Sequence, residues 1–277
     1  MKIAFFGNTK YSVIDARILN DKFGLLLIVT KPDKPTGRKR ELIPNPVKQF
    51  AQEKKVPFLE ADKLGKNIIS KIKDYHPDFS VVADYGLILP KEVLGIAKYA
   101  SLNVHHSLLP KYRGPSPAPS AILAGETVSG VTIIRMTEDI DAGDILAQKE
   151  YELSEDETTD SLLAKLNTLG GELVCGVIEN YLDLKPKKQD GSKVSQTQRL
   201  KKPDGFIDLE NPPDAEMLDR MIRAYFPWPT VWTKLDGKII KLLPNGLIQP
   251  EGKRTMSIKE FKNGYPKAFQ KISALFE

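Results

Sequence analysis

The segment around residues 101–110 holds side chains that could carry out group transfer. Asn103 and His105 stand two positions apart at the end of a short apolar run, which reads as a β-strand over residues 102–105. Because side chains alternate along a strand, both would project from the same face. An amide N–H can donate to an oxyanion, and an imidazole can take a proton from a nucleophile. The pair therefore has the parts of an acid–base site.

An acidic loop further along the chain offers a third group. Asp139, Asp141 and Asp144 follow a strand-like run over residues 130–136. One of these carboxylates could orient the imidazole, as the acid does in hydrolase triads. In the alternative, non-catalytic interpretation, the histidine forms its hydrogen bonds within a turn and the acidic loop faces water. Spacing alone leaves both interpretations open.

Three other features near the strand ends are interpreted as structural. His106 would point to the opposite face of the strand from His105, and His76 precedes Pro77 in a loop. The turn at residues 7–9 follows the first strand but lacks the G-x-G-x-x-G spacing of dinucleotide sites. We therefore expect no dinucleotide cofactor.

The elements that must position these groups follow a βαβ rhythm. Strand-like apolar runs cover residues 3–6, 25–30, 56–59, 79–83 and 102–105. Helix-like stretches cover residues 47–54, 67–75 and 160–182, the last weakened by Gly170 and Gly171. Fully apolar strands are typical of a parallel sheet covered on both faces. The pattern predicts an α/β fold: a Rossmann-like, open, mostly parallel sheet with helices on both faces, whose carboxyl edge binds ligands.

The chain changes character after this predicted domain, which covers residues 1–184. Residues 185–204 are polar and basic, as in a linker. Residues 205–277 then contain a helix-like stretch at 215–224 and two strand-like runs, 231–235 and 238–243, around Asp236 and Gly237. We predict a small C-terminal domain of α+β type.

The composition of the chain excludes several classes of protein. The 41 Lys and Arg residues exceed the 36 Asp and Glu residues by 5, and 41% of the chain is hydrophobic, so a disordered chain is excluded. Apolar runs fall short of the roughly 18 residues of a membrane span, and no secretory signal is evident at the N-terminus. The single Cys175 excludes an intrachain disulfide or a thiolate zinc cluster. We expect a cytoplasmic protein with no membrane partner.

Several motifs together carry a family resemblance. They lie at residues 103–105, 107–110, 112–115, 130–133 and 141–144, with a basic loop at 30–48 and a further match at 85–90. The chain resembles the 10-formyltetrahydrofolate-dependent formyltransferases, and its basic loop is most similar to that of the methionyl-tRNA formyltransferase branch. In that family the C-terminal domain is a small β-barrel. The segment after Gly205 is short for a closed barrel, so a shortened domain or partial barrel is expected.

The resemblance implies transfer of a formyl group from 10-formyltetrahydrofolate to the α-amino group of methionine on initiator tRNA. His105 would be the base, Asn103 the oxyanion donor and Asp141 the acid that orients His105. Asp144 is a weaker alternative to Asp141. No metal is required.

The resemblance also assigns binding residues. The folate-contacting segment would be Ser107, Leu108, Leu109 and Pro110, and the backbone of Tyr85, Gly86, Leu87, Ile88 and Leu89 would line the pterin pocket. Arg38, Lys39 and Arg40 would contact the tRNA, because arginine forks suit phosphates and base edges. Without the resemblance, a solvated charge run is the simpler interpretation of this loop.

Two other functions share these residues. The first is N-formylation of a nucleotide-linked amino sugar, which the shortened C-terminal region favours and the basic loop disfavours. The second is a non-catalytic RNA-binding protein. The motifs at residues 103–105 and 141–144 argue against it, because a binding protein needs no base aligned with an oxyanion donor. We expect the chain to act as a monomer.

Overall fold

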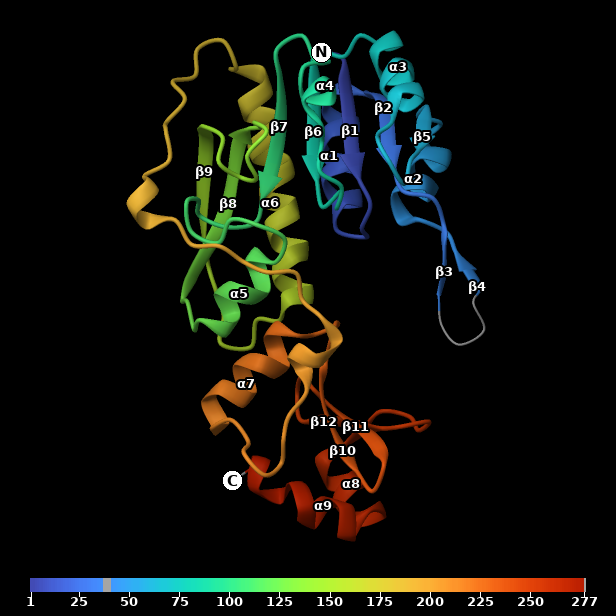
Figure 1. Ribbon diagram of the computed structural model, residues 1–277, viewed down its shortest axis with the longest axis vertical. Helices are drawn as coiled ribbons and strands as arrows, with labels where there is room; N and C mark the ends of the chain where they lie inside the picture. The colour runs from blue at the N-terminus through green and yellow to red at the C-terminus, as the bar shows by residue number, and fades with distance from the viewer. Residues whose placement is uncertain (37–40, 277) are drawn as a thin grey trace. The chain divides into compact units, whose positions relative to one another are not determined.

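The computed structural model describes residues 1–36 and 41–276 (Figure 1). Contacts divide the chain into two units. The first comprises Met1–Pro115, Ser129–Tyr151 and Leu163–Gln196, and the second comprises Ser116–Val128, Glu152–Leu162 and Thr197–Glu277.

The first unit is built on a seven-stranded sheet in the order β5-β2-β1-β6-β7-β8-β9. The strands are β1 (Ile3–Gly7), β2 (Leu25–Thr30), β5 (Phe58–Glu60), β6 (Phe79–Ala83), β7 (Ala100–His105), β8 (Val128–Arg135) and β9 (Ile145–Glu152). Strands β5, β2, β1, β6 and β7 pair in parallel, whereas β8 is antiparallel to β7. The predicted open, mostly parallel sheet is confirmed.

Helices cover both faces of this sheet, as Figure 1 shows. They are α1 (Ser12–Phe23), α2 (Pro46–Lys54), α3 (Lys66–Asp74), α4 (Lys91–Leu94) and α6 (Thr159–Glu179). Strand β1 has no polar side chain because both of its faces are buried: Ile3 and Phe5 pack in the core with α1, α2 and α6, while Ala4 and Phe6 pack in the core with α3 and α4.

Helix α6 packs closely against the strand that carries the candidate site. A Cβ atom added to Gly170 would lie 2.4 Å from Cγ1 of Val104 in β7, so a larger residue would push the helix away. The glycines that weaken the helical pattern therefore allow close packing. By length and composition alone, α6 could cross a membrane. Its residues Val174, Val177 and Ile178 instead belong to the buried core.

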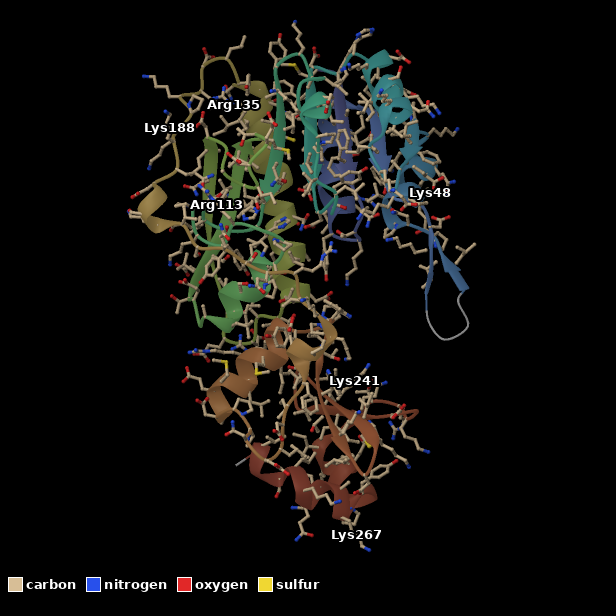
Figure 2. The ribbon with its side chains drawn as sticks, viewed as in Figure 1. Lys48, Arg113, Arg135, Lys188, Lys241 and Lys267 are labelled. Atoms are coloured by element: carbon tan, nitrogen blue, oxygen red, sulfur yellow. The ribbon has the colours of Figure 1, made fainter. Side chains whose placement is uncertain are left out.

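The basic loop after β2 contains a short hairpin. Strands β3 (Lys34–Thr36) and β4 (Glu41–Ile43) pair antiparallel. The loop ends at α2, where the Asn45 side chain caps the helix by accepting from the backbone N–H groups of Val47 and Lys48. The Lys48 ammonium, labelled in Figure 2, forms ion pairs with Asp33 at 2.9 Å and Glu60 at 3.0 Å. Lys48 is thus already neutralised within the protein.

The second unit contains an antiparallel sheet in the order β10-β11-β12-β13. Its elements are α5 (Pro117–Leu123), α7 (Ala215–Ala224), β10 (Val231–Leu235), β11 (Lys238–Leu243), β12 (Leu247–Pro250), β13 (Met256–Ser257), α8 (Ile258–Gly264) and α9 (Pro266–Ile272). Asp236 and Gly237 join β10 to β11 with φ angles of 49° and 78°, as a two-residue hairpin with both central φ angles positive requires. The predicted small C-terminal domain is confirmed as an α+β arrangement with four strands.

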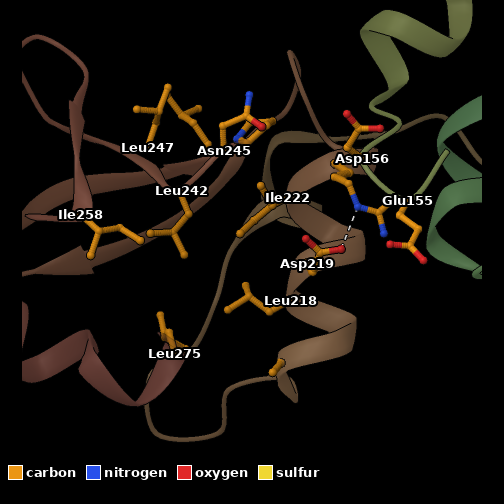
Figure 3. A pocket seen from close by; sticks show the side chains of 15 residues that line it. Glu155, Asp156, Leu218, Asp219, Ile222, Leu242, Asn245, Leu247, Ile258 and Leu275 are labelled. Carbon is orange, nitrogen blue, oxygen red and sulfur yellow. Dashed lines mark hydrogen bonds and ion pairs between the residues drawn. The ribbon is translucent and has the colours of Figure 1, made fainter. Parts of the chain in front are cut away.

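A cavity of about 560 Å³ lies within the second unit (Figure 3). Its wall combines apolar side chains such as Leu218, Ile222 and Leu242 with polar ones such as Asp219 and Asn245. At its edge, the Asp219 carboxylate accepts from Nε of Arg223 at 2.7 Å, so these two charges neutralise each other. The residues that line this cavity belong to the second unit, whereas Asn103, His105 and Asp141 belong to the first.

Candidate active site

Strand β7 places Asn103 and His105 on one face, as the alternation predicted. His105 is the last residue of the strand and is 4% exposed, while Asn103 is half-buried. The strand pairs with β6 as far as Asn103 and with β8 as far as His105. The two side chains therefore lie at the carboxyl edge of the sheet, where ligands bind in open α/β folds.

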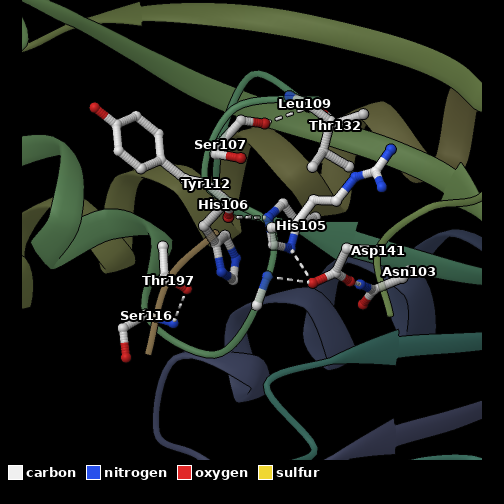
Figure 4. A network of polar contacts seen from close by, with 12 residues as sticks. Asn103, His105, His106, Ser107, Leu109, Tyr112, Ser116, Thr132, Asp141 and Thr197 are labelled. Atoms are coloured by element: carbon white, nitrogen blue, oxygen red, sulfur yellow. Dashed lines mark hydrogen bonds and ion pairs between the residues drawn. The ribbon is translucent and has the colours of Figure 1, made fainter. Parts of the chain in front are cut away.

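The loop after β8 brings Asp141 to this pair (Figure 4). Its Oδ2 atom lies 3.6 Å from Nδ1 of His105, and its Oδ1 atom accepts from Nδ2 of Asn103 at 3.1 Å. The Oδ2 atom also accepts from the backbone N–H of Gly114 at 2.8 Å. The structure thus joins all three predicted catalytic residues through one carboxylate.

The second nitrogen of His105 faces a backbone carbonyl. Its Nε2 atom lies 3.0 Å from the carbonyl oxygen of Tyr112, a residue with a left-handed φ of 61°. With the carboxylate of Asp141 beside Nδ1, the ring lies between two acceptors. A ring that carries protons on both nitrogens can donate to both, which suits the state reached after a base has taken a proton.

Asp144, the weaker alternative to Asp141, is held elsewhere. Its Oδ2 atom accepts from Nη2 of Arg135 at 2.5 Å, and this hydrogen bond raises the pKa of Arg135 (labelled in Figure 2). The geometry therefore favours Asp141 over Asp144 as the partner of His105.

His106 points away from the pair, as the strand alternation predicted. It is buried, and its Nδ1 atom lies 3.5 Å from Oδ1 of Asp84. Figure 4 labels the side chains of His105 and His106. Burial lowers the pKa of His106, although the charge of Asp84 acts in the opposite direction. This histidine is a buried side chain of the fold.

In the proposed folate-contacting segment, several polar groups form hydrogen bonds within the protein. The Ser107 hydroxyl donates to the carbonyl of Lys111 at 2.7 Å, and the Leu109 N–H donates to Oγ1 of Thr132 at 3.1 Å. Ser107 and Leu109 are buried, whereas Leu108 and Pro110 are partly exposed. The structure thus leaves Leu108 and Pro110 as the side chains of this segment that reach the surface.

The proposed pterin-lining segment shows a similar division. Tyr85 and Leu89 lie in the core, where Tyr85 packs edge-on against Phe6, and burial raises the pKa of the Tyr85 phenol. Ile88 is 73% exposed. The carbonyl of Gly86 accepts from the Lys31 ammonium at 2.9 Å, and Leu87 is partly buried against the same core. Contacts with a ligand would come from backbone groups and Ile88.

The three residues predicted to bind tRNA, Arg38, Lys39 and Arg40, lie outside the described residues. Within the described ranges 1–36 and 41–276, no group of three or more His, Cys, Asp and Glu side chains is placed to hold a metal ion.

Sequence reasoning missed three contributors to the site. They are the N–H of Gly114, the carbonyl of Tyr112 and the side chain of Gln189, which donates to the carbonyls of Asp141 and Gly143 at 2.7 and 2.8 Å. The first two act through the backbone, so side-chain chemistry gives no signal for them. Gln189 sits in a polar segment that looks like a linker, and its partners are more than 40 residues away in sequence.

Comparison with known proteins agrees with this geometry. The formyl transferase family matches residues 1–178, and its C-terminal domain family matches residues 199–247. The methionyl-tRNA formyltransferase of Chloroflexus aggregans is 39% identical over 275 residues, covering 96% of this chain and 87% of that protein. The methionyl-tRNA formyltransferase of Thermodesulfovibrio yellowstonii is 34% identical over 296 residues, covering 95% of each chain.

A solved structure shares the fold. HypX from Aquifex aeolicus, in complex with tetrahydrofolic acid, superposes with a TM-score of 0.64 at 19% identity and covers 88% of this chain. This chain spans 37% of that longer protein. The resemblance expected from the sequence motifs is thus confirmed by identity over nearly the whole chain. The chain belongs to the formyl transferase family, within its methionyl-tRNA formyltransferase branch.

Proposed function

We propose that this protein transfers a formyl group from 10-formyltetrahydrofolate to the α-amino group of methionyl initiator tRNA, with Asn103, His105 and Asp141 as its catalytic residues. The names of its relatives support the reaction. The observation that carries the residue assignment is the Asp141 carboxylate, which contacts Asn103 and His105 together.

The roles follow from the charges that develop. The bound donor supplies a formyl group attached to a nitrogen that can leave. His105 takes the proton that the attacking amine loses as the new C–N bond forms, and it returns a proton to the leaving nitrogen when the old C–N bond breaks. Asp141 holds the ring and stabilises its protonated form.

Asn103 is placed to stabilise the oxygen that gains charge during the attack. One N–H of its amide donates to Asp141, which fixes the orientation of the side chain. An amide nitrogen carries a second N–H, which is available for the oxyanion. A hydrogen bond of this kind contributes about 3 kcal/mol to the transition state.

The Tyr112 carbonyl lies where the amine must approach Nε2 of His105. Hydrogen bonds at catalytic groups are commonly rearranged between the free enzyme and the substrate complex. We expect the amine to replace this carbonyl as the partner of Nε2 when the acceptor binds.

The residues of the 85–89 segment fit a folate-type donor. The Gly86 backbone has a φ of 71°, the Ile88 side chain is exposed, and Tyr85 and Leu89 are packed in the core. This combination gives a firmly anchored loop with backbone groups and one apolar side chain at its surface. Such a surface can contact a flat heterocycle by hydrogen bonds and by apolar contact.

Arg38, Lys39 and Arg40 are proposed to contact the tRNA. Replacing Arg38 with Lys keeps one charge but removes the planar fork that can pair with phosphate or a base edge through two hydrogen bonds. Arg38→Lys should raise KM for methionyl-tRNA while donor binding stays unchanged. The salt dependence of tRNA binding should become shallower by about one contact in Arg38→Ala.

The deciding experiment offers purified protein 10-formyltetrahydrofolate with methionyl initiator tRNA, and in parallel an amino-sugar nucleotide. Formylation of the aminoacyl-tRNA alone is the expected result. Transfer to the amino sugar alone would replace the proposed acceptor with the sugar alternative.

A further inference from the structure

We propose that Gln189 is a positioning residue for the formyl transfer, because its side chain ties the loop of Asp141 to the turn beside His105. The inference rests on the proposed roles of His105 and Asp141. Gln189 lies 48 residues beyond Asp141 in the chain, and both belong to the first unit.

The hydrogen-bonding capacity of the Gln189 amide is fully used. Its Nε2 atom donates to the carbonyls of Asp141 at 2.7 Å and Gly143 at 2.8 Å. Its Oε1 atom accepts from Nε of Arg113 at 3.0 Å and from Nη2 of Arg113 at 2.7 Å. A carboxamide has two N–H donors and two acceptor lone pairs, so these four contacts satisfy it completely.

The Asp141 loop has a backbone that needs such support. Asp141 has a φ of 51°, a left-handed conformation that is unfavourable for a residue other than glycine. At Gly143 the backbone approaches β8 so closely that an added Cβ atom would lie 1.8 Å from the carbonyl oxygen of Arg135. Gln189 binds the carbonyls of both residues and so holds the loop in the shape that aims the carboxylate at His105.

The segment that carries Gln189 also holds the other side of His105. Ser195 accepts from the N–H of Tyr112 through its hydroxyl at 2.8 Å, and its carbonyl accepts from the N–H of Arg113 at 2.8 Å. The Tyr112 carbonyl in turn faces Nε2 of His105. Residues 187–195, which we name the strap, thus fix the groups on both sides of the imidazole.

Gln189 is more buried than the residues next to it in the strap. Gln189 is partly buried, whereas Lys188 and Asp190 are exposed. Figure 2 labels Arg113 and Lys188, which both belong to the first unit. Gln196 is an exposed residue of the same type directly after the strap, and its side chain provides a matched control.

The test compares Gln189→Ala, Gln189→Glu and Gln196→Ala in single-turnover and steady-state formyl transfer to methionyl-tRNA. Gln189→Ala should lower kcat by about 10- to 100-fold, the effect of a small misplacement of a catalytic group, with both KM values within about twofold. Gln189→Glu should be equally slow, because a carboxylate can still accept from Arg113 but cannot donate to the loop carbonyls. Gln196→Ala should match the wild type.

A double-mutant cycle with Asp141→Asn tests whether Gln189 acts through Asp141. In the Asp141→Asn background, Gln189→Ala should lower the remaining rate by less than about twofold. The inference is overturned if Gln189→Ala keeps the wild-type kcat, if Gln189→Glu restores it, or if the two substitutions have independent effects. It is also overturned if thermal unfolding shows that the loss of rate follows loss of folded protein. If the wild type itself transfers no formyl group, the proposed function fails instead.

Discussion

The carboxylate of Asp141 lies 3.6 Å from Nδ1 of His105, although the two residues are 36 positions apart in the chain. The same carboxylate accepts from Asn103 at 3.1 Å and from the N–H of Gly114 at 2.8 Å. A carboxylate with these contacts is oriented before substrate binds, so little reorganisation is needed during the reaction. The carboxylate beside His105 is therefore itself fixed by contacts with β7 and with the turn at Gly114.

The oxyanion role of Asn103 gives the first prediction. Asn103→Ala removes the amide donor and should lower kcat by about 100- to 1,000-fold, as loss of an oxyanion donor does in other enzymes. Single-turnover rates with saturating donor and acceptor measure the effect, and calorimetry checks that the donor still binds. Ser101→Ala changes another residue on the same face of β7 and should leave the rate within a few fold. Equal rates for Asn103→Ala and the wild type would exclude the role.

The acidic loop gives the second prediction, with its own matched control. Asp141→Asn keeps the size of the side chain but removes its charge, so it should lower kcat by at least about a hundredfold. Asp144→Asn breaks the pair with Arg135 instead and should have an effect of less than about fivefold, because that pair is partly exposed. If Asp144→Asn proves the more damaging of the two, the assignment of the orienting acid is reversed.

Buried Asp15 gives a prediction about stability and pH. Both of its carboxylate oxygens are buried without a hydrogen-bond partner in the part of the chain that the structure describes. Burial raises the pKa of Asp15 well above its ordinary value, and the charge of Asp84 raises this pKa further. A group with a raised pKa in the folded state contributes its full stability below the unfolded pKa, and this contribution is lost as the pH rises through the folded pKa.

Asp15→Asn removes this titration. Its Tm should exceed that of the wild type by at least about 3 °C at pH 8, and the difference should shrink as the pH falls towards 4. Asp21→Asn, an exposed change on the same helix, should show no such trend. A Tm difference for Asp15→Asn that does not vary with pH would contradict the prediction.

The single Cys175 gives the fourth prediction. Burial, with a smaller effect of Glu179, raises the pKa of its thiol to about 11. The thiolate is the reactive form, so the folded protein at pH 8 should react with a disulfide reagent only as fast as it unfolds. One equivalent should react at once in denaturant. Rapid labelling of the folded protein would show that Cys175, which lies in α6, is not buried in the core.

The strand pattern predicted much of the fold and half of the site. Alternation along residues 102–105 placed Asn103 and His105 together and His106 on the other face, because the period of a strand is set by its backbone. Strand β9 was not predicted: residues 147–152 are mostly polar, since β9 is an edge strand and much of it is exposed. The hydrophobic pattern also gave no sign that Asp15 is buried, because a charged residue is normally expected at the surface.

The contacts that join distant segments at the site could not be predicted from local sequence. Asp141 was predicted from a family motif. Nothing in that motif indicates that the side chain of Gln189 donates a hydrogen bond to the Asp141 carbonyl. Contacts between segments more than 40 residues apart depend on how loops return across the sheet. The polar composition of residues 185–204 suggested a linker, yet Gln189 and Ser195 hydrogen-bond to the site.

The measurement that tests the central claim most directly is the single-turnover rate of formyl transfer from 10-formyltetrahydrofolate to methionyl initiator tRNA, compared between the wild type and His105→Ala. The wild type should formylate the aminoacyl-tRNA, and His105→Ala should be slower by at least about a hundredfold with donor affinity within about twofold. A His105→Ala protein that is folded and transfers the formyl group at the wild-type rate would contradict the account.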